Sequence, residues 1–431
     1  MPGSSHRSGA LLAALALAGF LFVPEAECQQ YSAPGSLTET RLPRREAIAK
    51  GVAEARWQLG GLRLDPWLSL SNLSYVNDVF SGSGGPAVSD FTASVGAGLR
   101  AYLPVGQNTT LGAYALPEYV WWRDQKDRRQ VIGRYGAGVF SYFNRLTVEI
   151  TGSSNEQQRV ASPEFNQLAV SKLDQVEGLV ELRAVHSLWL TAALRDGSRS
   201  YDVKGLDEQR APAFNRLDRD EQVARFGARV TLAGSWKVGA GIESSTTEFK
   251  DPTFARSNSG DYPYLTVDVD TGRHRLAVEA VAQQLDPEPG SEFVPFDELT
   301  GTFVYELEIG PRLTASVYAS RLLSYSLLDD YAYTYGKSTG VSLDWEPSRR
   351  TRFSVSAEQG EERYTLAPSS TAAERLDDVT GSSFQAQFRL HPKVALSLGF
   401  TRSKYDSNLD RFDRSFDQVT TSISLGGLDW P

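Results

Sequence analysis

Between about Leu62 and Leu425 the sequence is divided into stretches of roughly ten residues in which every second residue is apolar. A strand that crosses a bilayer needs about 9–11 residues, with one apolar face and one face that tolerates polar groups. An open sheet would leave backbone N–H and C=O groups unpaired in lipid, whereas a closed barrel pairs them all. The alternation therefore predicts an all-β fold, a transmembrane antiparallel β-barrel, over residues 61–431.

The alternating stretches amount to about eighteen strands, an even number as in bacterial single-chain barrels. The connections after even-numbered strands are short and those after odd-numbered strands tend to be long. The short ones include Pro104–Gln107, His186-Ser187, Gly234, Asp270–Arg273, Gly310-Pro311, Pro347–Arg349 and His391-Pro392. The long ones include Val76–Ser89, Gln157–Lys172, Tyr201–Asp220, Phe249–Gly260, Asp286–Phe296, Tyr364–Leu376 and Tyr405–Ser415. Short periplasmic turns and long external loops are typical of such barrels, so both termini are expected in the periplasm.

Residues 1–28 have the features of a secretory signal peptide. His6 and Arg7 precede an apolar run, and Ala26 and Cys28 occupy positions −3 and −1 if cleavage precedes Gln29. The alternative is a lipoprotein acylated at Cys28. Beyond the signal, the sequence contains neither Cys nor Met, which excludes disulfides and thiolate chemistry. It also has no run of 18 apolar residues, so no inner-membrane helix is predicted.

Residues 29–60 are expected to form a periplasmic segment that contains one short helix. Between Arg44 and Trp57, apolar residues such as Ile48 and Val52 recur at helical spacing. Gly60-Gly61 would end this segment. The helix is expected to pack against the periplasmic rim of the barrel, and the alternative is a helix that enters the lumen as a plug.

If the apolar face contacts lipid, the residues of opposite parity line the lumen. A charge on the lipid face at mid-bilayer costs about 2–4 kcal/mol, which constrains the parity strongly. The lumen-lining candidates are Arg100, Tyr114, Glu118, Trp122, Arg134, Glu149, Glu181, Arg183, Arg195, Arg225, Arg229, Glu243, Asp268, Glu279, Glu306, Glu308, Glu358, Gln387 and Arg389. Most of these charges are expected to pair across neighbouring strands, and a minority to form a constriction that selects permeants by charge.

Three further features depend on this parity. Lys337 shares the parity of Val341 and Leu343, so a β-bulge or the outer membrane rim is expected there. Outward Trp and Tyr residues at strand ends are expected to form interfacial girdles. Tyr114 and Trp122, which have the inward parity, are the candidates for contact with a sugar.

The sequence shows no pattern typical of an enzyme. Beyond the signal its histidines are His186, His274 and His391, which lie at separate predicted turns without an evident Ser or Asp partner. There is no metal-ligand spacing and no phosphate-binding loop. We therefore predict no catalytic residue, no cofactor and no bound metal. A net charge of −9 argues against nucleic acid as a partner.

One part of the chain resembles a known family. The segment Ser74–Phe80 (SYVNDVF), then Ser89-Asp90-Phe91 and Leu99–Gly106 (LRAYLPVG), resembles the opening hairpin of β-barrel porin-2 type outer-membrane proteins. Glu54–Gly60 is similar to the lead-in of some members. The resemblance covers about the first quarter of the predicted barrel and implies the outer membrane of a Gram-negative bacterium.

Proteins of this type are often associated with exopolysaccharide loci, so the resemblance implies a conduit for exopolysaccharide export. The implied partners are outer-membrane lipid, the barrel-insertion machinery, the polysaccharide and periplasmic export components. That machinery usually reads a terminal aromatic residue, whereas this chain ends in Trp430-Pro431. The main alternative is a general or sugar-selective porin for small solutes, and a further alternative is a closed structural or adhesive barrel.

Overall fold

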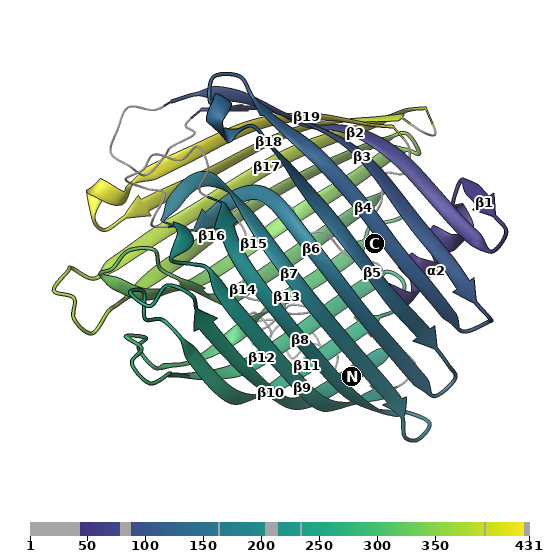
Figure 1. The fold of residues 1–431 in the computed structure, drawn as a ribbon, viewed down its shortest axis with the longest axis horizontal. Coiled ribbons are helices and arrows are strands. Elements are labelled where there is room, and N and C mark those ends of the chain that lie inside the picture. Colours follow the sequence, from purple (N-terminus) through teal and green to yellow (C-terminus); the bar gives the residue numbers. More distant parts are fainter. Residues whose placement is uncertain are drawn as a thin grey trace, which may run out of the picture.

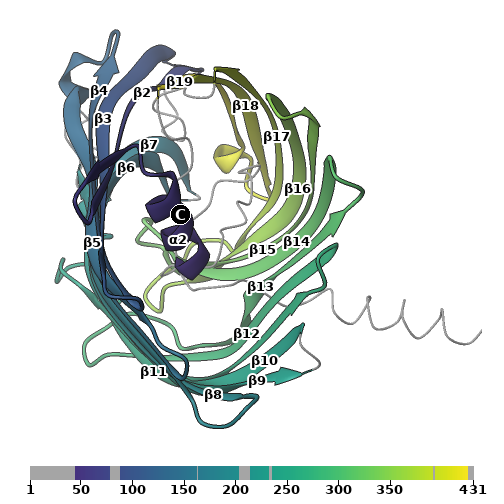
Figure 2. The ribbon, with the colours of Figure 1, turned by 90° about the vertical axis from the view of Figure 1, so that its right-hand side faces the viewer.

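The computed structural model describes residues 44–77, 88–162, 164–202, 214–232, 235–391 and 394–425. The predicted signal peptide, its cleavage site, Cys28, and the C-terminal residues 426–431 lie outside these ranges. Within them, eighteen long strands form one antiparallel sheet, and its last strand pairs with its first. Figures 1 and 2 show the closed barrel that results. The predicted fold class and strand number are confirmed.

The elements follow one another along the chain in a simple up-and-down order, and each barrel strand pairs with its sequence neighbours. Their bounds are α2 (Arg44–Glu54), β1 (Trp57–Leu59), β2 (Leu62–Val76), β3 (Asp90–Val105), β4 (Thr109–Trp122), η1 (Lys126–Arg128), β5 (Gln130–Tyr142), β6 (Leu146–Ser162), β7 (Phe165–Arg183), β8 (Leu188–Asp202), β9 (Arg219–Leu232), β10 (Trp236–Phe249), β11 (Asn258–Asp270), β12 (His274–Pro287), β13 (Phe296–Glu308), β14 (Leu313–Tyr325), β15 (Tyr331–Ser348), β16 (Thr351–Leu366), β17 (Arg375–His391), β18 (Val394–Ser407), η2 (Asp410–Phe412) and β19 (Arg414–Leu425).

The two ends of the barrel differ in the length of their connections, as predicted. At one end, called here the short-turn end, strands are joined by connections such as 106–108, 143–145, 271–273 and 349–350. At the other, the loop end, the connections include 250–257, 288–295, 367–374 and 408–413. The N-terminal end of β2 and the C-terminal end of β19 both lie at the short-turn end.

The outer wall exposes a belt of large apolar side chains at alternate positions. Val95 is 56% exposed, Phe226 64% and Ile242 61%, and Val341, Val355 and Phe384 are exposed in the same way. A contiguous exposed apolar surface of this kind is stable in lipid and not in water. The belt confirms the parity assigned from the sequence. Among the described residues, no helix is long and apolar enough to cross a bilayer.

In the structure, strand replaces most of the predicted loop 157–172. Strands β6 and β7 continue through it as a hairpin, with Val160 opposite Leu168 and Arg159 opposite Ala169. Polar residues such as Gln157 and Gln158 favoured a loop in the sequence. The continuous backbone ladder between the two strands outweighs that local preference.

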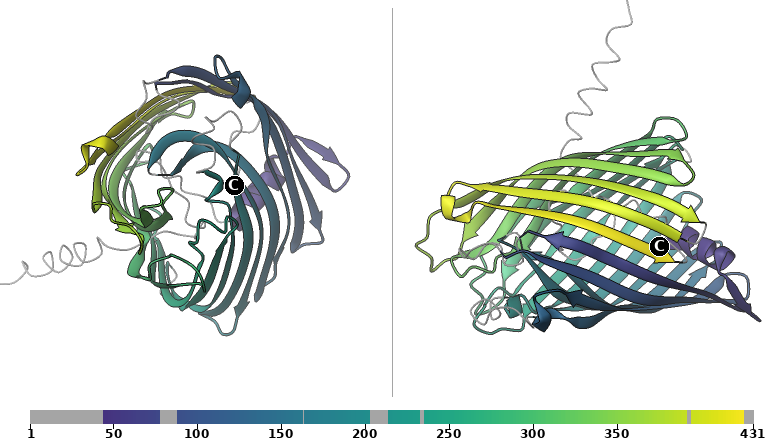
Figure 3. Two further views of the ribbon diagram at one scale, coloured as in Figure 1. Left: turned by 60° about the vertical axis from the view of Figure 1, so that its left-hand side comes forward. Right: turned by 90° about the horizontal axis from the view of Figure 1, so that it is seen from above.

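The tip of this hairpin leaves the barrel wall and crosses the lumen. Strand β6 pairs with β5 only as far as Asn155 opposite Arg134, although both strands continue beyond that rung. Val170, which has the outward parity of the exposed Val176, is instead buried against Trp122 on the inner face of β4. Figure 3 (left) shows the β6–β7 hairpin arching across the opening of the barrel.

A second segment, the loop-end half of β14 and β15, also turns into the barrel. The β13–β14 ladder stops at Gly301 opposite Arg321, although both strands run on. Gly301 adopts φ +139, and a Cβ there would collide with the Glu279 carbonyl oxygen, so this position requires glycine. Beyond it, Tyr325 packs edge-on against Phe249 of the inner face of β10, with 4.8 Å between ring centroids. The wall is therefore split between β13 and β14 at the loop end.

The predicted helix forms, but it is shorter than expected. α2 ends at Glu54, because Trp57–Leu59 pairs with the start of β2 around Gly60, whose φ is +61. Ile48 of α2 is buried against Tyr102 and Phe140, which have the inward parity. The helix thus lies on the inner wall at the short-turn end, where the Arg45 guanidinium is 5.3 Å from the ring of Tyr142, the last residue of β5 (Figure 2).

Candidate functional site: the lumen

The candidate site is the inner face of the barrel, formed by side chains that alternate with the lipid-facing belt. Every lumen-lining candidate from the sequence lies on this inward parity in its strand. What these residues do to a permeant stays a prediction, but their geometry divides them into three groups: paired charges along the wall, residues covered by the inward-folded segments, and residues beside the short turns.

The most connected charge on the wall is Arg225 of β9. Its guanidinium contacts two carboxylates at once, Glu243 of β10 and, at 2.7 Å, Oε1 of Glu279 of β12. The Tyr262 hydroxyl donates to the second oxygen of Glu243 at 2.9 Å. A single cation therefore holds two anions, and a tyrosine fixes one of them, which limits rearrangement of this part of the wall.

Other inward charges pair across one or two strands in the same manner. Arg229 contacts Glu181 at 3.0 Å, Arg134 contacts Glu118 at 3.8 Å, and Arg100 contacts Asp65 at 3.7 Å. Arg275, which the sequence prediction omitted, contacts Glu306 and Glu308, both at 3.9 Å. The expectation that most lumenal charges pair across neighbouring strands is confirmed for these residues.

The helix adds a cation to the short-turn end of the lumen. Arg44 of α2 donates to Oε2 of Glu149 at 3.0 Å and to Oε2 of Glu177 at 3.3 Å. A Cβ on Gly51 would collide with the Tyr102 ring, so only glycine allows the helix this close to the wall. The helix is held by both charge and packing, and it occupies part of the cross-section there.

Some of the candidates lie beside short turns and others are only half-buried. Arg183 donates to the His186 carbonyl at 2.7 Å, next to the β7–β8 turn. The Tyr114 hydroxyl donates to Asn155 at 3.5 Å, and Tyr318 donates to Glu358 at 3.3 Å. The remaining inward candidates are Arg195, Asp268, Gln387 and Arg389.

Trp122 is not available for contact with a sugar, contrary to the sequence prediction. Its side chain is 0% exposed, because the β6–β7 hairpin covers it and the Arg128 guanidinium lies 4.6 Å from its ring. Parity alone could not show this, because Val170, which covers Trp122, has the parity of the lipid-facing side chains of β7. Of the outward girdle residues, Trp345 and Tyr119 are exposed as expected, whereas Tyr331, Tyr333 and Tyr335 are buried, because the loop-end half of β15 turns into the barrel.

The two inward-folded segments meet at the loop end. Oε2 of Glu164, at the turn of the β6–β7 hairpin, accepts a hydrogen bond of 3.1 Å from the Leu327 backbone N–H, next to β14. Around the outer half of β14, loop and strand residues form one apolar cluster. Its members include Phe214, Leu217, Phe254, Phe293, Phe296, Leu323 and Tyr325. This cluster and the hairpin narrow the lumen at the loop end.

A buried charge cluster near the loop end was missed in the sequence. Arg375 contacts Oδ2 of Asp377 at 2.6 Å, and Arg414 contacts the same oxygen at 3.2 Å. The Arg375 guanidinium lies 3.9 Å from the ring centroids of both Tyr364 and Phe412. The spacing of Arg375 and Asp377 by two residues was the available signal, because alternate strand residues share a face.

In the part of the chain that the structure describes, no set of three or more His, Cys, Asp and Glu residues could hold a metal ion. His186, His274 and His391 lie at different short turns, and His274 contacts the Tyr305 hydroxyl at 2.7 Å. The inner face can therefore present a polar, charge-paired surface to water and solutes.

The closed eighteen-stranded sheet and its apolar outer belt define an outer-membrane β-barrel of the Gram-negative type. No family model matches the chain, and no curated protein matches it. Among solved structures it is similar to OpdL of Pseudomonas aeruginosa, with 12% identity over 85% of this chain and 99% of that one and a TM-score of 0.48. It is also similar to OccK2 (OpdF) of the same organism, with 13% identity, 85% and 98% coverage and a TM-score of 0.49.

A BenF-like porin from Pseudomonas fluorescens Pf-5 matches to the same degree, with 13% identity, 84% and 99% coverage and a TM-score of 0.49. At this level of identity and superposition, the similarity says nothing about the solute that this chain handles.

Proposed function

We propose that this protein is a passive outer-membrane channel for small hydrophilic solutes. The observation that carries the proposal is an inner wall of polar and charged side chains inside a closed barrel, beneath an apolar outer belt. The residues that would contact permeants are those of the charge-paired wall, with Arg225, Arg229 and Arg134 among them. Because these charges are largely compensated, we expect weak charge selectivity.

A conduit for exopolysaccharide, which the porin-2 resemblance implies, agrees less well with the geometry. Helix α2 occupies part of the lumen at the short-turn end, and the β6–β7 hairpin crosses it at the loop end. A polymer chain would require both obstacles to move, whereas a small solute requires only the gaps beside them. The porin-2 assignment, the periplasmic position of both termini, and partners such as the insertion machinery stay predictions.

Proteoliposome swelling tests this proposal. Vesicles that contain the refolded barrel are diluted into isotonic solutions of sugars of increasing size, and light scattering reports uptake. We expect fast swelling with monosaccharides and a steep decline for oligosaccharides. Swelling no faster than protein-free vesicles would contradict a small-solute channel.

A deletion strain distinguishes the export alternative. Loss of the gene should leave surface polysaccharide unchanged and slow the uptake of small sugars. Loss of surface polysaccharide with normal sugar uptake would favour the export conduit instead.

A further inference from the structure

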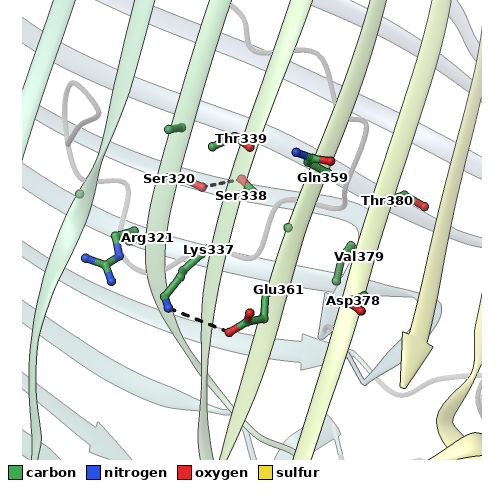
Figure 4. A pocket seen from close by; sticks show the side chains of 13 residues that line it. Ser320, Arg321, Lys337, Ser338, Thr339, Gln359, Glu361, Asp378, Val379 and Thr380 are labelled. Carbon is green, nitrogen blue, oxygen red and sulfur yellow. Dashed lines mark hydrogen bonds and ion pairs between the residues drawn. The ribbon is translucent and has the colours of Figure 1, made fainter. Parts of the chain in front are cut away.

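The outer wall carries a polar hollow that a lipid-facing surface does not require. It has a volume of about 530 Å³ and spans the loop-end half of β14 to β17. Gly301 of β13 lies at its edge, where β13 and β14 separate. The side chains that line the hollow come from neighbouring strands, with Arg321 and Lys337 on one side and Glu361 and Asp378 on the other (Figure 4).

Four charged residues cross this hollow in one row. Arg321, Lys337, Glu361 and Asp378 are direct Cα partners on successive strands. The register of β14 with β15 is regular from Lys337 to Val341, and Val341 is 54% exposed on the outer belt. By alternation, the row therefore lies on the outer face. The register shifts between β15 and β16 lie at Tyr331/Tyr333 and at Trp345/Ser348, so no bulge accounts for Lys337.

The row lies two rungs beyond the apolar belt. Val317 and Val341 are partners on the belt, and Ala319 and Thr339 form the rung between them and the row. The four-residue step from Val317 to Arg321 spans about 13 Å along a strand. The hollow therefore lies at the loop-end edge of the apolar belt, where the headgroups of that leaflet would be.

The charges are arranged as two like pairs, which points to a ligand. Arg321 lies directly opposite Lys337, and Glu361 lies directly opposite Asp378. Like charges directly opposite each other destabilise a sheet. Glu361 is also the direct partner of Lys337, which reaches it at 4.0 Å, and Arg363 contacts it at 3.9 Å, two weak contacts with opposite charge. Arg321 and Lys337 also lie near the Tyr335 ring, at 5.5 Å and 5.9 Å from its centroid.

An anionic group between Arg321 and Lys337 would relieve the first repulsion. Hydroxyl groups that donate to Glu361 and Asp378 would satisfy the carboxylates, with Gln359 as a further partner in the hollow. A phosphorylated sugar offers both kinds of group in one molecule. Acyl chains attached to it would continue over the belt at Val341 and the rungs below.

We propose that this hollow binds the phosphorylated-sugar headgroup of an outer-leaflet glycolipid, with Arg321 and Lys337 on the phosphate. The site rests on the predicted orientation of the barrel, with the loop end facing the outer leaflet, and not on what passes through the lumen. Its ligand would anchor the segment of wall next to the β13–β14 split.

Native mass spectrometry of the detergent-solubilised barrel with added purified lipid A tests the proposal. We expect one tightly bound lipid A on the unmodified protein and at least tenfold weaker binding to an R321S/K337S variant. The matched control is K404S, which removes an outward cation of β18 outside the hollow and should bind as the unmodified protein does. Equal binding by all three proteins, or equal loss in both variants, would overturn the site.

A second measurement does not depend on the variants folding. On the unmodified protein, removal of the lipid A phosphates should weaken binding at least tenfold, and unchanged binding would overturn the proposal. Cross-linking of a Q359C variant to a second copy in place of lipid binding would show instead that this face is a subunit contact. Conductance of the same preparation reports the channel separately, so failure of the lipid site and of the channel are distinguishable.

Discussion

Arg375 and Asp377 show how strongly single residues constrain this barrel. Both side chains are completely inaccessible although both carry charge. A buried ion pair contributes little net stability over an apolar pair, but removing one partner leaves a charge without compensation. Here Arg414 provides only one further contact to Asp377. These residues therefore determine the packing of β16, β17 and β19 near the loop end.

At this scale we expect Arg375→Ala to lower the free energy of unfolding by about 3–5 kcal/mol, because Asp377 stays buried. Urea unfolding in lipid vesicles, followed by tryptophan fluorescence, measures the change. Arg352→Ala is the control, since its 2.8 Å contact with Asp344 is partly exposed and should contribute less than about 1 kcal/mol. Equal effects in the two variants would contradict this account of the cluster.

A second residue-scale prediction concerns ion selectivity. Arg225→Ala removes the cation that contacts both Glu243 and Glu279, so the lumen becomes more negative. The reversal potential in a salt gradient should then shift toward cation selectivity. Arg402→Ala, on the outer face, should leave it unchanged. An unshifted reversal potential in Arg225→Ala would show that ions do not pass this cluster.

Alternation was sufficient to place the individual lumenal residues on the correct face, from Arg100 to Arg389. It was insufficient for Trp122, which is inward but covered. It also missed Arg375 and Asp377, because Arg375 falls in the predicted loop Tyr364–Leu376 and Asp377 directly follows it. Parity is a local property, whereas burial depends on which distant segment covers a residue.

Among the elements, the β6–β7 hairpin is the one that the sequence could not locate. Val170 and Val176 have the same parity, yet one is buried inside the barrel and the other is exposed on the outer wall. Where the hairpin leaves the wall, Oε2 of Glu156 accepts a hydrogen bond of 3.1 Å from the Gly133 N–H. This contact satisfies a backbone donor that the missing ladder leaves free.

Replacing residues 158–169 by a short Gly-Ser link should raise single-channel conductance several-fold, because the lumen loses the segment that crosses it. The barrel should still form, since the β5–β6 ladder is untouched between the Arg134–Asn155 rung and the short-turn end. Heat-modifiable migration on gels checks assembly. An assembled variant with unchanged conductance would mean that the hairpin does not limit the pore.

For the molecule as a whole, strand number and loop asymmetry were predictable, because lipid imposes one strand length and one alternation on every strand. The split between β13 and β14 was not, because it depends on contacts such as the 2.7 Å hydrogen bond from the Tyr335 hydroxyl to the Leu299 carbonyl. Both the narrowing of the lumen and the outer hollow follow from that split. The features specific to this protein thus lie where the barrel departs from an ideal cylinder.

Single-channel recording in a planar bilayer shows directly whether a water-filled path crosses the barrel. We expect steady, ohmic conductance steps from protein shown to be assembled by its heat-modifiable migration. Assembled protein that inserts into the bilayer but passes no current would contradict such a path, and would favour a barrel closed by α2 and the β6–β7 hairpin.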